Sequence, residues 1–482
     1  MKLIYEIIQK LNKQELRQVK HVLKTSLFTH EKVGKLFELV TQNPEKEEAF
    51  YSQKLYNKAP DNTFRVTKSR LKRMLENIIL QDKSLTGYSS KSINILLQSK
   101  KKLLQGEILL GRGAYNASKN LLFQVISNTQ KYQLHNELFQ AQLLMYRNRS
   151  IRTTVKDFEK NTKELLALNQ LCAKVNEVSI LHYSISNLLL NQTLEKNQVS
   201  DVRSTLDRMR LLTEETQHPL AQNLYLLSEI YFQLISHDFE TALSFCEKYL
   251  QLIQAESSLF SKQKLGSAYV QLASVSLQLG KMENAKRYVD ESLKIYEPDE
   301  MNYLVALELA FRIAYFSLAY DNAQYHIKTA FKHPQFEASQ ILTARWHYFQ
   351  ACLLFRMEKF RAAYKSLNNT SPLLADKYGN VHIRIMEIIL MFECKNYDLL
   401  ETKILNMRQY VKRSQKDAQL LRPNALIKIL LKWYKYDFQF KKTLKQVQPL
   451  LKELHSLEEY NPILTSGFEL VRLEQWFIDK SE

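Results

Sequence analysis

The sequence contains little glycine and little proline, the two residues that most often interrupt regular structure. Only 9 Gly and 9 Pro occur in 482 residues, against averages of roughly 7% and 5%. Residues that favour helices, chiefly Leu, Lys, Gln, Glu and Ala, are frequent in most segments, and no run alternates apolar and polar residues between regularly spaced turns. The scarcity of breakers argues against a turn-rich β fold and predicts an all-α protein.

Cysteine pairs and long apolar runs are also missing. The four cysteines are far apart and form no C-x-x-C pair, so we interpret them as small buried side chains. No uncharged apolar run reaches the 18 residues that suggest a membrane helix. The first ten residues carry Glu6 and Gln9 where a signal peptide would be apolar. These features predict a cytoplasmic protein without a membrane span.

The short motifs of catalysis are absent as well. The sequence contains no phosphate-binding loop, no dinucleotide-binding glycine pattern, no zinc-protease motif and no nucleophile elbow. Its 11 histidines form no cluster with metal-ligand spacing. We therefore expect a protein that is not an enzyme and that needs no cofactor and no metal. An enzyme whose residues meet only in three dimensions remains the alternative.

Positive charge is present in excess, and it is concentrated near the two ends of the chain. The formal net charge is +18, of which residues 1–102 contribute +11 and residues 402–452 another +11. The last thirty residues, in contrast, carry −5. A surplus of this size favours an acidic partner or nucleic acid.

The clearest local pattern is a helical hairpin between Gly266 and Pro298. Apolar residues recur at spacings of three and four on two segments, and Gly280 separates the segments. Each segment therefore forms a helix with one buried face, and the two helices run antiparallel around a turn.

This hairpin resembles the tetratricopeptide repeat (TPR). Ala273 and Ala285 stand at the small-residue positions of that family, and Gly280 matches its turn glycine. Ser276 departs from the pattern because the family has an aromatic residue there, and Pro298 comes one residue late. The resemblance implies stacked hairpins whose first helices line a concave, partner-binding groove.

Similar hairpins recur along the chain. Two-helix units begin near residues 91, 132, 172, 219, 260, 301, 337, 378 and 417, a period of about 40 that exceeds the ~34 of an ordinary TPR. Several second helices begin with an aromatic residue followed three positions later by a small one, as in Phe239 and Ala242 or Phe360 and Ala363. We expect the small residue to lie where the two helices approach most closely.

The chain divides into two predicted domains at the stretch Thr86 to Ser90, which is rich in turn residues. Residues 1–86 form a basic N-terminal helical bundle, in which Asn12 and Glu15 have the spacing of a capping box. Residues 91–482 form a TPR-like superhelix of about nine helix pairs. A helix from about Leu464 to Asp479 closes it as a C-terminal cap.

Candidate groove residues lie on the first helices of two successive units. They are Arg312 and Tyr315 in one unit, and Arg345, Tyr348 and Arg356 in the next. Arginine binds carboxylates through two hydrogen bonds and tyrosine adds apolar contact area, so this set suits an acidic peptide. The alternative is that these side chains only pack between repeats or face solvent.

Two basic patches could instead contact phosphates. One lies on the helix that follows Pro60 and carries Arg65, Lys68 and Lys72. The other lies on a helix predicted from residue 424 to residue 445, whose lysines share the face opposite an apolar stripe; they are Lys428, Lys432, Lys435 and Lys442. A lysine stripe can follow a nucleic-acid backbone, although most such stripes are solvated helix faces.

The N-terminal region has two interpretations. The order of its elements resembles bacterial regulators in which a helix-turn-helix precedes a TPR-like sensor, but its turn lacks the expected glycine. Alternatively it caps the first repeat, which is the interpretation we favour. The sequence therefore predicts a non-catalytic scaffold that binds an acidic peptide or protein in its groove. A nucleic-acid-binding regulator that uses the N-terminal region is the alternative, and the oligomeric state stays open.

Overall fold

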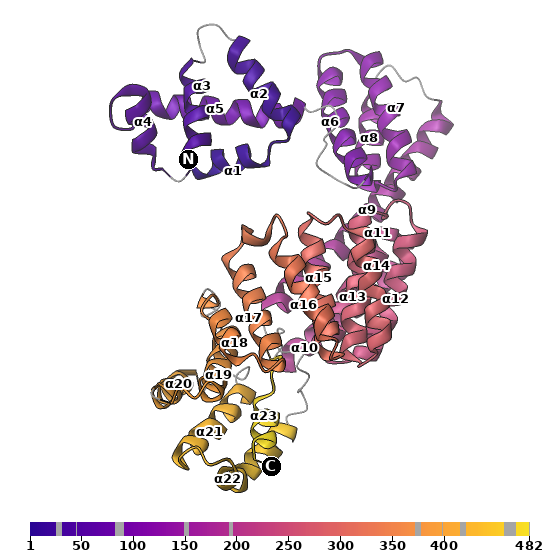
Figure 1. The fold of residues 1–482 in the computed structure, drawn as a ribbon. Coiled ribbons are helices and arrows are strands. Elements are labelled where there is room, and N and C mark those ends of the chain that lie inside the picture. The colour runs from indigo at the N-terminus through magenta and orange to yellow at the C-terminus, as the bar shows by residue number, and fades with distance from the viewer. Residues whose placement is uncertain are drawn as a thin grey trace. The chain divides into compact units, whose positions relative to one another are not determined.

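The computed structural model describes residues 1–25, 31–44, 46–81, 91–148, 154–191, 196–371, 377–397, 399–414, 421–456 and 469–481. These residues form 23 α-helices and one short 3-10 helix, without any strand (Figure 1). The predicted all-α fold class is therefore confirmed. None of the helices in these ranges is both long and apolar enough to cross a membrane.

The chain forms two compact units, which are described separately. The first comprises Met1–Asn176 with Ser257–Ser261, and the second comprises Glu177–Glu256 with Lys262–Glu482. The predicted domain boundary at residues 86–90 lies outside the described residues, so a division at that point stays a prediction.

The first unit begins with five helices that share a hydrophobic core. They are α1 (Lys2–Lys10), α2 (Lys13–Thr25), α3 (Glu31–Gln42), α4 (Glu48–Tyr56) and α5 (Asn62–Gln81). The predicted capping box starts α2: the Glu15 amide donates to Asn12 Oδ1 at 2.9 Å, and the Asn12 amide donates to Glu15 Oε2 at 2.8 Å. Each side chain thus satisfies a backbone amide that the first turn of a helix leaves unbonded.

The first unit continues with longer helices. They are α6 (Lys91–Gly111), α7 (Tyr115–Lys131), α8 (His135–Arg147) and the first part of α9 (Val155–Asn191). The predicted start of a repeat near residue 172 is wrong, because α9 continues through this position for 37 residues in all. None of those residues is Gly or Pro, so nothing in the local sequence ends the helix there.

The second unit is a series of helical hairpins in which each helix packs against the next. After α10 (Lys196–Thr216), the first helices of the hairpins are α11 (Pro219–Ile235), α13 (Lys262–Gln278), α15 (Met301–Phe316), α17 (Gln340–Arg356), α19 (Lys377–Glu393) and α21 (Leu421–Lys435). The second helices are α12 (Phe239–Ala255), α14 (Met282–Ile295), α16 (Tyr320–Phe331), α18 (Phe360–Leu367), α20 (Leu400–Ser414) and α22 (Phe440–Ser456). A 3-10 turn, η1 (Phe336–Ala338), precedes α17, and α23 (Leu473–Asp479) ends the described chain.

One turn geometry joins the two helices of every hairpin in the second unit. A residue with positive φ ends each first helix, and these residues are His237, Gly280, Leu318, Glu358, Lys395 and Asp437. The next amide then bonds a carbonyl five residues back, as Ala319 does to Ala314 at 2.9 Å. This is the Schellman arrangement, which usually places glycine at the left-handed position. Since only Gly280 is glycine here, the low glycine content does not mean that turns are few.

The spacing of an aromatic and a small residue is confirmed at the hairpin contacts. Ala242, Ala285, Ala323 and Ala363 are completely buried, each on the second helix of its hairpin. Thr443 is also completely buried and follows Phe440, the first residue of α22, by three positions. The single helix predicted over residues 424–445 is therefore wrong: α21 ends at Lys435, and the left-handed residue Asp437 reverses the chain before α22.

Gly266 allows an unusually close contact in the hairpin of α13 and α14. A Cβ atom at this position would lie 2.5 Å from the Tyr296 ring, far inside van der Waals contact. The Tyr296 hydroxyl reaches the backbone carbonyl of Gln263 at 3.4 Å. The ring thus packs directly on the backbone of α13.

Candidate functional site

The tyrosines predicted to line an open groove are covered. Tyr315 on α15 is 3% exposed and Tyr348 on α17 is 2% exposed. The Tyr315 hydroxyl donates to the backbone carbonyl of Leu470 at 2.9 Å and accepts a hydrogen bond from Arg356 Nε at 3.2 Å. Burial raises the pKa of Tyr315 and that of Tyr348 above the usual value. Both phenols therefore stay neutral and contact other parts of the second unit.

Two of the three predicted groove arginines share one carboxylate. Arg312 Nη2 and Arg345 Nη2 lie 2.5 Å and 2.8 Å from Glu308 Oε1. Both guanidinium groups also lie near the ring of Phe349, at 5.7 Å and 5.6 Å from its centre. The structure thus brings the predicted groove residues together but gives each one a contact within the chain. Their role toward a partner stays a prediction.

The element that covers Tyr315 is the C-terminal segment, defined here as residues 469–481. Its apolar side chains Leu470, Val471, Leu473, Trp476 and Phe477 join the same hydrophobic core as residues from α15 to α22. The predicted helix from Leu464 is wrong in its described part, because α23 begins only at Leu473; residues 464–468 lie outside the described chain. The preceding residues are not helical, and the Leu470 carbonyl there is bonded to Tyr315.

An aromatic cluster receives the segment's two adjacent rings. Trp476 lies 5.6 Å from Trp433 and 5.5 Å from Phe440, and Phe477 lies 5.2 Å from Phe440. The Trp476 indole nitrogen donates to Glu393 Oε1 at 2.7 Å. Aromatic side chains of this size supply much of the energy of a buried contact, and the hydrogen bond to Glu393 satisfies the indole N–H that is buried with the Trp476 ring.

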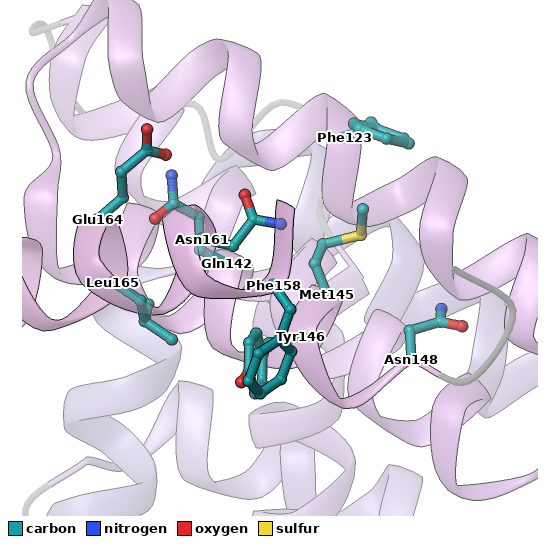
Figure 2. A pocket seen from close by; sticks show the side chains of 9 residues that line it. All are labelled: Phe123, Gln142, Met145, Tyr146, Asn148, Phe158, Asn161, Glu164 and Leu165. Atoms are coloured by element: carbon teal, nitrogen blue, oxygen red, sulfur yellow. The ribbon is translucent and has the colours of Figure 1, made fainter. Parts of the chain in front are cut away.

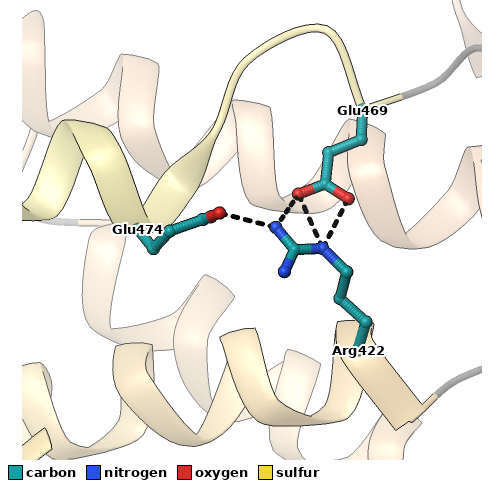
Figure 3. Close-up of polar contacts among 3 residues, drawn as sticks. All are labelled: Arg422, Glu469 and Glu474. Carbon is teal, nitrogen blue, oxygen red and sulfur yellow. Dashed lines mark hydrogen bonds and ion pairs between the residues drawn. The ribbon is translucent and has the colours of Figure 1, made fainter. Parts of the chain in front are cut away.

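Arg422 at the start of α21 binds two carboxylates of the segment (Figure 3). Its Nη2 lies 2.7 Å from Glu469 Oε1 and 2.6 Å from Glu474 Oε1, and its Nε lies 2.9 Å from Glu469 Oε2. Burial raises the pKa of Glu469 to about 7, although the hydrogen bonds from Arg422 act in the opposite direction. The two glutamates in turn raise the pKa of Arg422 against the effect of its burial. One cation thus holds two carboxylates in a largely dry environment.

We use the name docking surface for the residues that hold this segment: Tyr315, Glu393, Arg422, Trp433 and Phe440. All but Phe440 lie on first helices of the hairpins. Sequence analysis missed the charged members, because it treated the charge of each region separately. The opposite signs of residues 402–452 and of the last thirty residues were the available signal.

A second feature of the first helices is a pocket beside Lys264. It has a volume of about 340 Å³ and is lined from α11, α13 and α15, with Tyr249 and Tyr296 at its side. Burial lowers the pKa of Lys264. The buried amide oxygens of Gln263 and Gln271 have no hydrogen-bond partner among the described residues. The residues that line this pocket include no carboxylate.

The first unit contains a pocket of about 330 Å³ between α7, α8 and α9 (Figure 2). Phe123, Tyr146 and Phe158 contribute aromatic rings to its lining, and Glu164 is its one charged lining residue. The Tyr146 and Phe158 rings contact each other at 5.4 Å. A cavity of this size with mixed apolar and amide lining has the general character of a small binding site, and sequence analysis did not single it out.

The predicted basic patches differ in their surroundings. Arg65 and Lys72 are exposed on α5, whereas Lys68 is half-buried and pairs with Glu48. In the second patch the lysines do not share one helix, since Lys428, Lys432 and Lys435 lie on α21 and Lys442 lies on α22. Lys432 donates to the backbone carbonyl of Gln446 at 2.8 Å. The helical spacing on which the second patch depended is therefore wrong.

The structure offers no obvious metal centre in the part of the chain that it describes. No group of three or more His, Cys, Asp and Glu side chains there could hold an ion. His333, for example, is buried, and both of its ring nitrogens contact the backbone: one lies 3.1 Å from the Glu300 carbonyl and the other accepts from the Gln335 amide.

Comparisons with known proteins find likeness among solved structures alone. No protein-family model and no curated protein matches the chain. Among solved structures, it is similar to a Signal Transduction ATPase with Numerous Domains protein with a tetratricopeptide repeat sensor from Pyrococcus horikoshii, at 13% identity and a TM-score of 0.43. The match covers 83% of this chain and 66% of that protein. By its own stacked hairpins, their turns and their buried small residues, the chain is a TPR-like helical repeat protein.

Proposed function

We propose that this protein is a non-catalytic interaction scaffold whose first helices bind a carboxylate-bearing segment of a partner protein. The observation that carries the proposal is the hold of Arg422 on Glu469 and Glu474. In this contact a hairpin helix already binds a carboxylate-bearing segment of the same chain, and this supports the binding of a similar segment from a partner. A cytoplasmic location is part of the proposal, supported by the four cysteines, which are all free thiols.

The Lys264 pocket is the part of the first helices where we expect the partner's carboxylate to bind. Lys264 lines this pocket, and a carboxylate makes a charge-assisted hydrogen bond to an ammonium group. The unpaired amide oxygens of Gln263 and Gln271 can accept from the backbone amides of a bound peptide. The pocket therefore offers one cation and two acceptors to an extended acidic segment.

A peptide-binding measurement on the full chain tests this function. The probe is a fluorescent synthetic peptide that alternates glutamate with leucine and tryptophan, followed by anisotropy. We expect Lys264→Gln to weaken binding by roughly 10- to 150-fold, since a hydrogen bond to a charged group contributes about 1.5–3 kcal/mol. Lys262→Gln is the matched control, because Lys262 is exposed two residues away and pairs with Glu297. Equal binding by wild type and Lys264→Gln would remove this pocket from the proposal.

A nucleic-acid-binding role is the second candidate, and one observation favours it. Arg65, Arg70 and Arg73 are all exposed on α5, so this helix presents several cations to solvent. Phosphate contacts of this kind predict that affinity falls steeply with salt: a plot of log affinity against log salt concentration should have a slope near −0.9 per contact on duplex DNA. Gel retardation at ~50 mM salt compares binding by the wild type with binding by Arg65→Glu/Arg73→Glu. The absence of any retarded DNA or RNA would eliminate this candidate.

A further inference from the structure

The contacts that hold the C-terminal segment are made by chemical groups that a different polypeptide could supply. Two carboxylates five residues apart meet Arg422, and an adjacent Trp-Phe pair meets the aromatic cluster. The backbone contributes the Leu470 carbonyl to Tyr315. These groups lie within nine consecutive residues, so one short peptide could present all of them.

The docking surface has its own packing beneath the segment. Phe392, Trp433 and Phe440 contact one another at ring-centre distances of 4.9, 5.0 and 5.3 Å. These three rings come from α19, α21 and α22, which pack together as neighbouring hairpin helices. The aromatic cluster that Trp476 and Phe477 contact is therefore formed by the hairpins, not by the segment.

The segment itself depends on that surface. Its helix α23 has only 7 residues, and isolated helices shorter than about 12 residues are marginal in water. Its two carboxylates are buried beside Arg422, and taking charged groups out of water costs free energy that their ion pairs offset only in part. A short helix that buries two carboxylates therefore binds this surface less tightly than its apolar contacts alone would allow.

We propose that residues 469–481 act as an intramolecular ligand, and that the docking surface exchanges them for a partner segment of the same chemistry. That segment carries two carboxylates five residues apart, followed by adjacent aromatic residues. This inference rests on the proposed scaffold function, and it assigns a second binding surface to it, separate from the Lys264 pocket. The affinity of a partner is then reduced by the fraction of molecules in which the chain's own segment is bound.

The test measures binding of a fluorescent peptide with the sequence of residues 469–481, ELVRLEQWFIDKS, to the full chain. The variant Trp476→Ala/Phe477→Ala removes the two anchoring rings from the chain's own segment and leaves the docking surface unchanged. Gln475→Ala is the matched control, because Gln475 is exposed between the buried residues. A second peptide with glutamine at both glutamate positions tests the contribution of Arg422.

We expect the double variant to bind the peptide at least about tenfold more tightly than wild type and Gln475→Ala, because its surface is vacated. The glutamine peptide should bind it more weakly. Equal binding by wild type and the double variant overturns the exchange but leaves the scaffold function standing. No binding by any of the proteins overturns the docking surface as a site for segments in trans.

The double variant loses buried rings and could unfold locally, so its thermal melting is measured with and without the peptide. If the peptide occupies the vacated surface, it raises the melting temperature of the double variant and leaves that of Gln475→Ala unchanged. The proposal is contradicted if the double variant melts at a lower temperature than the wild type and the peptide does not raise its melting temperature. In that case the peptide fails to replace the missing contacts.

Discussion

Replacing Glu469 by glutamine removes one of the two carboxylates that share Arg422, and it changes how the docked segment responds to pH. Burial raises the pKa of Glu469 from 4.5 to about 7. The charged groups that act on it are Arg422, Glu474 and Arg472, and Tyr348 on α17 is close enough for its own pKa to be raised further by Glu469. Since the folded-state pKa lies above the unfolded one, folding takes up a proton between these two values.

The sign and the size of the effect follow from this difference. The stabilising contribution of the protonated form is complete at low pH and is lost as the pH rises through about 7. Each pKa unit corresponds to about 1.4 kcal/mol, so the free energy of unfolding should fall by roughly 2 kcal/mol between about pH 5.5 and about pH 8. Glutamine stands in for the protonated acid and cannot ionise, so the variant should lack this dependence.

Tryptophan fluorescence during urea unfolding is a suitable assay. All three tryptophans, Trp346, Trp433 and Trp476, are buried in the core that the segment joins. We expect the wild type to lose about 2 kcal/mol of stability between the two pH values and Glu469→Gln to lose clearly less. The exposed Asp479→Asn variant is the control and should behave as the wild type. Equal pH slopes in wild type and Glu469→Gln would refute the reasoning.

Three further substitutions test the fold and the docking surface. Leu318→Gly should stabilise the second unit by about 0.5 kcal/mol, because relief of a left-handed residue (roughly 1–2 kcal/mol) exceeds the entropy cost of glycine; Leu318→Ala keeps the strain and should show no gain in thermal melting. Gly266→Ala should cost about 1–3 kcal/mol, since its Cβ would overlap the Tyr296 ring, and an unchanged melting temperature would contradict that contact. Arg422→Gln should release the segment, because buried carboxylates that lose their cation cost about 3–5 kcal/mol; limited proteolysis at the C-terminus measures the release, and wild-type resistance would contradict it.

Features governed by near neighbours in the chain could be predicted from the sequence. The capping box joins Asn12 and Glu15, three residues apart, and the buried alanines of four second helices each follow the first residue of their helix by three positions. The turn at Asp437 escaped prediction for an equally local reason. This left-handed turn contains no glycine, so the sequence gives no sign of a helix end there, and α21 and α22 were predicted as one helix.

The candidate site could be predicted only in part, because its contacts connect distant segments. Tyr315 was recognised as a first-helix residue, yet its hydrogen bond to Leu470 joins positions 155 residues apart. Arg422 and Glu469 were seen only as parts of a basic and an acidic region. Lys264 was overlooked because the pocket around it is formed by three separate helices. The spacing of residues within one helix carries no information about contacts between segments that are distant in the sequence.

Hydrogen exchange of the backbone amides between Leu470 and Asp479 in the full-length wild type is the most direct test of the central claim. A helix of 7 residues is too short to protect its amides in isolation, so slow exchange there reports docking onto the hairpins. We predict protection of these amides in wild type and its loss in Arg422→Gln. Exchange at the rate of an unfolded chain in the wild type would contradict the account.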